Sequence, residues 1–123
     1  MTNTYPSPPS LQTRFVTVKM DDVSTAGSTW VVPGFQCRIK KITSVISGAI
    51  TNANAAITTE IGGVAVTGGA LTIATAASAA GDVDTAVPTA LNVVSVDQPV
   101  EIITNGGSTG TVSATFTLEC EPV

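Results

Sequence analysis

The stretch "TVSATFTLEC", Thr111 to Cys120, alternates strictly between apolar and polar side chains. Its apolar set is Val112, Ala114, Phe116, Leu118 and Cys120, and its polar set is Thr111, Ser113, Thr115, Thr117 and Glu119. Successive side chains of a β-strand point to opposite faces, so this period of two predicts a strand with one buried and one wet face. Such a strand constrains the chain to a sheet that covers a core on one side.

Several shorter segments repeat this pattern or carry brief apolar runs between turn residues. They are residues 14–20, 29–33, 35–48, 55–61, 64–66, 70–74, 90–96 and 100–104. Gly, Asn and Pro separate them, and no segment has a convincing helical stripe. The Ala-rich residues 75–88 are expected to form a long loop, with a helical turn as the alternative. Together these segments predict an all-β antiparallel sandwich or barrel of about eight to nine short strands.

Two local features refine the expected strands. The alternation in residues 35–48 changes phase across Lys40 and Lys41, which indicates a bulge or bend. The stretch "GGVAVTGGA", Gly62 to Ala70, has the glycine spacing of a phosphate-binding loop. Such a loop needs Lys and then Ser or Thr after its last glycine, where this chain has Gly69 and Ala70. We therefore expect Val64 and Val66 in a strand, with turns at both Gly-Gly pairs and no nucleotide site.

The residue types leave little chemistry for catalysis. The chain has no His, which excludes Ser-His and Cys-His nucleophile pairs and the usual zinc sites. Cys37 and Cys120 lack C-x-x-C spacing and are predicted to be small buried hydrophobes, with a disulfide as the alternative. We expect no enzymatic activity and no cofactor.

Acidic residues offer two weak alternatives. Asp82 and Asp84, with Asp97 as a distant third ligand, would start a calcium site, but turn chemistry explains Asp82 equally well. The acidic residues Glu101, Glu119 and Glu121 fall on the predicted solvent faces of strands. They therefore do not predict the close carboxylate pair of a glycosidase.

Charge is distributed unevenly along the chain. All five basic residues lie within residues 1–41, and the remainder carries only acidic charges. This pattern argues against a nucleic-acid surface. The cluster Arg38, Lys40 and Lys41 is expected at a strand edge that is either solvated or partner-facing. No apolar run is long enough to span a membrane, and the first ten residues do not resemble a signal peptide.

The first twelve residues differ from the rest. Pro6, Pro8 and Pro9 fix φ and remove N–H donors, so residues 1–12 are expected to form an extended arm preceding one sandwich domain over 13–123. The arm is either a tail or a segment that lies along a neighbouring subunit, anchored by Tyr5 and Leu11. Trp30, next to Val31 and Val32, is expected in a core or an interface, with stacking on a sugar ring as the alternative.

Residues 48–118 resemble small virion proteins of tailed bacteriophages. The resemblance rests on "IGGVAVTGGALTIA" (61–74), "SAAGDVDTAVPT" (78–89) and "GGSTGTVSATFTL" (106–118). The pattern is similar to the capsid decoration, or cement, proteins of jelly-roll type. The same motifs also fit a receptor- or glycan-binding sandwich of a phage fibre or surface appendage.

The resemblance implies a structural protein on the outer surface of a phage capsid, assembled in the host cytoplasm. It implies a homo-dimer or homo-trimer that bridges subunits of the major capsid protein, without nucleic acid or membrane. The expected contact residues are Tyr5, Pro6, Pro8, Pro9, Leu11, Trp30, Arg38, Lys40 and Lys41.

Overall fold

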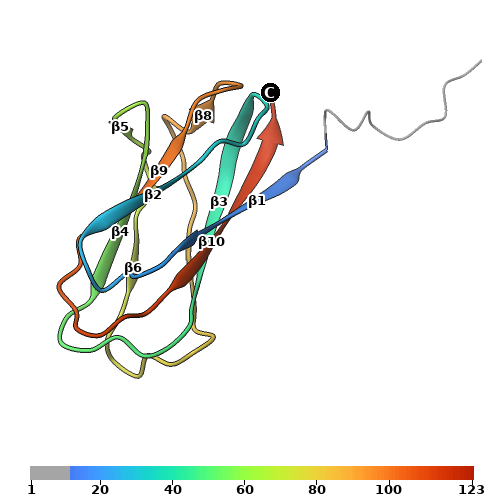
Figure 1. The fold of residues 1–123 in the computed structure, drawn as a ribbon. Helices are drawn as coiled ribbons and strands as arrows, with labels where there is room; N and C mark the ends of the chain where they lie inside the picture. Colours follow the sequence, from blue (N-terminus) through green and yellow to red (C-terminus); the bar gives the residue numbers. More distant parts are fainter. Residues whose placement is uncertain (1–11) are drawn as a thin grey trace, which may run out of the picture.

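The computed structural model describes residues 12–123, and this part of the chain is all-β (Figure 1). Its ten strands are β1 Arg14–Met20, β2 Gly27–Val31, β3 Cys37–Ile46, β4 Ala55–Ile61, β5 Val64–Ala65, β6 Leu71–Ile73, β7 Val83–Ala86, β8 Val93–Val94, β9 Val100–Thr104 and β10 Ala114–Pro122. The predicted count of eight to nine is close, because β5 and β8 contain only two residues each. The described residues include no helix long and apolar enough to cross a membrane.

The strands form two antiparallel sheets packed face to face. Sheet A has the order β1-β10-β3-β7, with β8 also paired to β3, and sheet B has the order β2-β9-β4-β5, with β6 also paired to β4. Leaving out the two-residue strands, β1, β3, β7 and β10 belong to sheet A, and β2, β4, β6 and β9 to sheet B. Eight strands shared between two sheets in this way form a jelly roll, so the predicted fold class is confirmed.

The inward faces of both sheets supply the core. On β10 the buried residues include Phe116, Leu118 and Cys120, as the alternation predicts, and on β4 they include Ile57 and Ile61. Outward neighbours on both strands are more exposed. The period of two therefore assigned these faces correctly, because it follows from backbone pleating alone.

The predicted irregularity at Lys40 and Lys41 is a β-bulge. Lys41 lies opposite Glu119, whereas Ile39 lies opposite Cys120, so Lys40 is the extra residue. Both lysines are exposed, while Ile39 and Ile42 on either side are fully buried. The bulge thus keeps the apolar residues inward on both sides of the phase change.

The glycine-rich stretch forms turns, but one detail of its prediction is wrong. Val64 belongs to β5, whereas Val66 lies outside any strand and is buried. The Val66 N–H donates to Thr59 O, and its carbonyl accepts from Gly69 N–H in a turn. This turn carries Val66 into the core instead of continuing the hairpin, and the chain enters β6 at Leu71 rather than a helix.

The loop predicted for residues 75–88 contains a strand. Residues 83–86 form β7 and pair with residues 42–45 of β3. The local sequence "VDTA" has little strand signal, because one of its outward positions is Val83 and one of its inward positions is Asp84. Pairing to β3 decides its conformation.

Candidate functional site: partner-binding surfaces

Exposed aromatic side chains lie on the two edge strands, β1 and β2, by which the two sheets contact each other. Phe15 is 67% exposed on β1, and Trp30 is 59% exposed on β2. Both strands are terminal strands of their sheets, and they contact each other at this side of the sandwich. Phe35, in the segment after β2, is half-buried, and the Arg14 guanidinium carbon lies 4.6 Å from its ring centroid. We call Phe15, Trp30 and Phe35 the aromatic edge.

Strand alternation explains why the Phe15 ring faces outward. On β1, Val16, Val18 and Met20 pack toward the core, so Phe15 must occupy the opposite face. Of the four aromatic residues that the structure describes, Phe116 lies in the core, Phe35 packs against the core from a half-buried position, and Phe15 and Trp30 are exposed. Large exposed aromatics are enriched in protein interfaces and their energetic hot spots.

The basic cluster lies elsewhere than expected. Arg38, Lys40 and Lys41 are on β3, which is paired on both sides within sheet A, so the prediction of a strand edge is wrong. The sequence does not reveal which strands are central, because that depends on long-range pairing. The cluster instead occupies the outward face of sheet A.

Acidic residues on the neighbouring strand β10 partly neutralise the positive charge of this cluster. Lys41 lies opposite Glu119 and Arg38 opposite Glu121, whereas the bulge leaves Lys40 without a directly opposite residue. Phe15 lies opposite Glu119 on the other side of β10, so Phe15, Glu119 and Lys41 form one row across three strands. The structure therefore groups the basic cluster with Phe15 and separates it from Trp30.

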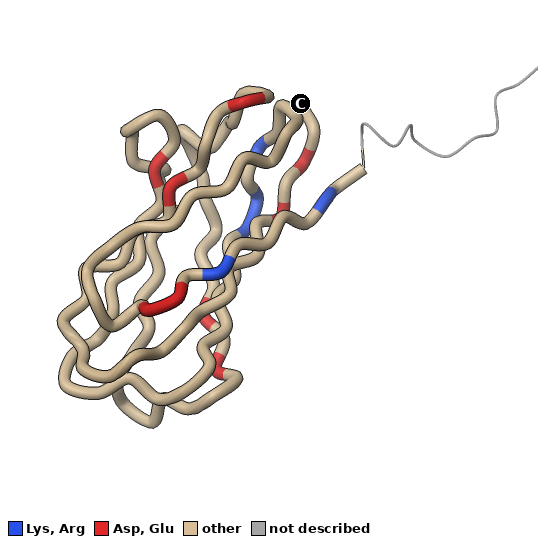
Figure 2. The backbone as a smooth tube through the Cα atoms, viewed as in Figure 1, with Lys and Arg blue, Asp and Glu red and all other residues tan. Residues whose placement is uncertain are grey.

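Sheet B carries a different row. Trp30 lies opposite Glu101, and Glu101 lies opposite Glu60, so one aromatic ring and two carboxylates lie side by side on three strands. Like charges directly opposite each other destabilise a sheet. All five basic residues of the chain are on β1 and β3 of sheet A, and sheet B has none (Figure 2). This acidic row, Trp30, Glu101 and Glu60, is thus not neutralised by its own sheet.

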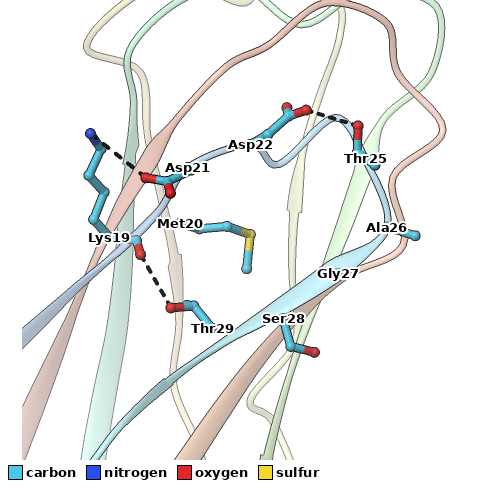
Figure 3. Close-up of a pocket in the computed structure, with 9 residues that line it drawn as sticks. All are labelled: Lys19, Met20, Asp21, Asp22, Thr25, Ala26, Gly27, Ser28 and Thr29. Carbon is cyan, nitrogen blue, oxygen red and sulfur yellow. Dashed lines mark hydrogen bonds and ion pairs between the residues drawn. The ribbon is translucent and has the colours of Figure 1, made fainter.

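A shallow cavity of about 370 Å³ lies between the end of β1 and the start of β2 (Figure 3). The Lys19 ammonium is 4.0 Å from the Asp21 carboxylate, and the Thr29 hydroxyl donates to Lys19 O at 3.3 Å. Met20 closes its floor as a buried residue. The ion pair is largely exposed and therefore weak, and the Thr29 hydroxyl is already hydrogen-bonded, so these contacts favour a structural role for the cavity.

Asp22 organises the loop at this cavity. Its Oδ1 accepts the N–H groups of Ser24 at 2.9 Å and Val112 at 3.2 Å, and its Oδ2 accepts the Thr25 hydroxyl at 2.8 Å. Burial by itself raises the pKa of Asp22, but these hydrogen bonds together outweigh burial and lower the pKa below its ordinary value. The carboxylate is a loop anchor that ties the β1–β2 connection to the segment before β10.

The described residues provide no set of ligands for the calcium site considered as an alternative. Among the described residues, no group of three acidic, His or Cys side chains converges on a common point. Asp82 accepts the Ala79 N–H at 2.9 Å, as turn chemistry predicts. Asp84 points toward the interior opposite Ser44, and its pKa is raised by burial and then by the Asp82 charge. Asp97 follows β8, which pairs with the opposite end of β3.

The predicted contact residues have different outcomes. Trp30, Lys40 and Lys41 are exposed, and Arg38 is half-buried. Tyr5, Pro6, Pro8, Pro9 and Leu11 lie outside the described residues. The register that places Glu60 opposite Glu101 was not predicted from the sequence. Both fall on outward positions of their strands, but only the register places them together.

Comparisons with known proteins identify no family. No family model matches the chain, and no curated protein matches it. Among solved structures, it is similar to a carbohydrate-binding module, CBM36 in complex with calcium and xylotriose. The identity is 14%, the TM-score is 0.40, and the match covers 87% of this chain and 72% of the module. A similarity this distant does not bear on what the chain binds.

Proposed function

We propose that this protein is a structural component of a virion surface, which decorates a phage capsid and bridges neighbouring subunits of the major capsid protein. In this role it performs no catalysis, needs no cofactor and acts as a homo-oligomer on the outside of the head. The resemblance of residues 48–118 to decoration proteins suggested this role, and jelly rolls are common in viral surface proteins.

The aromatic edge is the observation that carries the proposal. Phe15 on β1 and Trp30 on β2 lie on two edge strands that contact each other, and both rings are mostly exposed. Burying one such side chain against a partner contributes roughly 1.5–3 kcal/mol. Terminal strands also offer main-chain groups to an added strand of a partner. An edge with both features suits a protein that fills the seam between two other subunits.

The test measures binding of the full-length protein to undecorated heads by co-sedimentation. Trp30→Ala and Phe15→Ala are each expected to weaken binding at least about tenfold, as hot-spot truncations do. Val83→Ala is the matched control, because Val83 is 58% exposed on β7, at the other edge of sheet A. Failure of the wild-type protein to bind heads would reject the decoration role.

A second candidate function is glycan binding, and the acidic row favours it. An exposed Trp stacks on sugar rings, and neighbouring carboxylates accept hydrogen bonds from sugar hydroxyls. Glu101 lies directly opposite both Trp30 and Glu60. A glycan array followed by titration calorimetry of Glu101→Gln tests this function. Glycan binding that needs Trp30 and Glu101, without head binding, would replace the first proposal by the second.

A further inference from the structure

An apolar groove opens at one end of the sandwich, between β5 of sheet B and β8 of sheet A. It has a volume of about 460 Å³ and is lined by Ile61, Val64, Leu91, Asn92, Val93 and Gln98. Figure 1 shows β5 and β8 at the same end of the molecule. Val64 is 53% exposed, Leu91 63% and Val93 44%, so three large aliphatic side chains of the groove face solvent.

Hydrogen bonds fix the segment that lines one wall of the groove. The Asn92 side chain is buried, and its Nδ2 donates to Ile39 O at 2.7 Å. The Ile39 N–H donates in return to Asn92 O at 2.9 Å. These two bonds clamp the chain around Leu91 against β3. On the same wall, Gln98 Oε1 accepts the Ser95 N–H at 3.1 Å, which fixes the turn after β8.

Leu91 itself adopts an unfavourable backbone conformation. Its φ is +55°, in the left-handed region that a bulky side chain rarely occupies. This conformation costs about 1–2 kcal/mol, and the exposed side chain recovers little of it by burial in the monomer. Strain held in place by surrounding structure is often associated with a functional contact.

The N-terminal arm has the right chemistry to fill an apolar groove. Residues 1–11 contain Tyr5, Leu11 and three prolines and no charged side chain. They join the structure at Gln12, just before β1. Arg14 lies opposite Cys120, Cys120 opposite Ile39, and the adjacent Arg38 opposite Val93. The arm therefore leaves at the end of sheet A where the groove lies.

The length of the arm permits docking in its own groove or in that of another copy, and its proline content favours the other copy. Eleven residues reach about 34 Å when extended at ~3.1 Å per residue. The molecule's own groove lies across three strand spacings, ~14 Å, at the opposite edge of sheet A. Reaching it requires the arm to turn back within the few residues between Pro9 and Arg14. Prolines favour an extended course, and Pro9 is the proline nearest to β1. The sequence of the arm is therefore better suited to the groove of a neighbouring copy.

We infer that the N-terminal arm of one copy docks, through Tyr5 or Leu11 and the prolines, into the groove formed by Val64, Leu91 and Val93 of a neighbouring copy. This contact links copies of the protein to each other. It specifies how the copies of the proposed homo-oligomer contact each other. Because it is measured in solution without heads or sugars, its failure is distinguishable from a failure to bind heads or glycans.

The first test compares full-length variants by light scattering over a range of concentrations. Leu91→Asn removes the aliphatic wall while keeping the fold, because Asn tolerates positive φ. It is expected to weaken self-association at least about tenfold, and Tyr5→Ala with Leu11→Ala is expected to do the same. Val83→Asn is the control and should associate like the wild type. A wild-type protein that stays monomeric, or association unchanged in both variants, overturns the inference.

The second test places the arm in the groove directly. The double variant Leu11→Cys/Val64→Cys is oxidised mildly and examined on denaturing gels. Disulfides between copies, giving a ladder of dimers and higher species, are expected. The control, Leu11→Cys/Val83→Cys, places the second thiol on β7, where Val83 pairs with Val45 toward the other end of β3. A disulfide within one chain, or a ladder equally strong in the control, overturns the inference.

Discussion

Cys37 and Cys120 are diagonal neighbours on adjacent strands of sheet A. Cys37 lies opposite Pro122 and Cys120 opposite Ile39, and both thiols are free and fully buried on the inward face. The sequence places one near each end of the chain, so only the β3–β10 pairing brings them together. The prediction of buried thiols is confirmed.

The first prediction concerns thiol reactivity. Burial raises the pKa of Cys37, and it raises the pKa of Cys120 to about 12 with a further contribution from Cys37. Because the thiolate is the reactive form, neither cysteine should react with iodoacetamide at pH 8 in the native protein. Both should be labelled in denaturant. Mass spectrometry distinguishes the two cases, and rapid native labelling would contradict the burial of this pair.

A second prediction follows for alkaline pH. A folded-state pKa above the unfolded value means that the unfolded state loses its proton first, so stability falls as pH rises. From pH ~9 toward 12, Cys120 should reduce the free energy of unfolding by up to ~1.4 kcal/mol per pH unit. Urea unfolding at pH 8, 9 and 10 measures the slope. Cys120→Ala should have a shallower slope, and equal slopes would show that Cys120 does not contribute.

Removing either of two buried hydroxyls should change the free energy of unfolding, in opposite directions. Thr104 donates to Val23 O at 2.7 Å and accepts the Gly106 N–H at 3.2 Å. Thr104→Val leaves both groups unpaired and should cost about 2 kcal/mol. Ser44 is fully buried, and its hydroxyl has no hydrogen-bond partner among residues 12–123. Ser44→Ala should therefore be neutral or stabilise by up to ~1 kcal/mol. Thermal and urea unfolding of the pair checks the sign of each change.

Asp22 should contribute to stability at neutral pH and lose that contribution at acidic pH. Its folded pKa is lowered, so its contribution is complete above the unfolded pKa of about 3.9 and is lost as pH falls through the folded value. Asp22→Asn should cost about 1 kcal/mol at pH 7, a reduced value because the site is partly exposed. The difference from wild type should shrink below pH ~4. A constant difference from pH 7 to pH 3 would contradict a charge-dependent anchor.

Some of these sites were accessible from the sequence, and others were not. The inward faces of β4 and β10 and the bulge at Lys40 follow from the local alternation of side chains. The strand β7 was missed because its four residues form a strand only when β3 pairs with them. The groove was missed for a similar reason, since Val64 on β5 and Leu91 in the segment before β8 come together only in the folded sandwich.

The sequence alone determined that this chain forms short antiparallel strands with one apolar face. That outcome depends on pleating and turn residues, which act over a few positions. The tertiary structure alone decided which strands are central, which edges stay open and which residues lie opposite one another. It placed Glu101 between Trp30 and Glu60, moved the basic cluster from an expected edge to the middle of sheet A, and made Cys37 and Cys120 diagonal neighbours. Register and strand order depend on contacts between distant segments, and no local pattern encodes them.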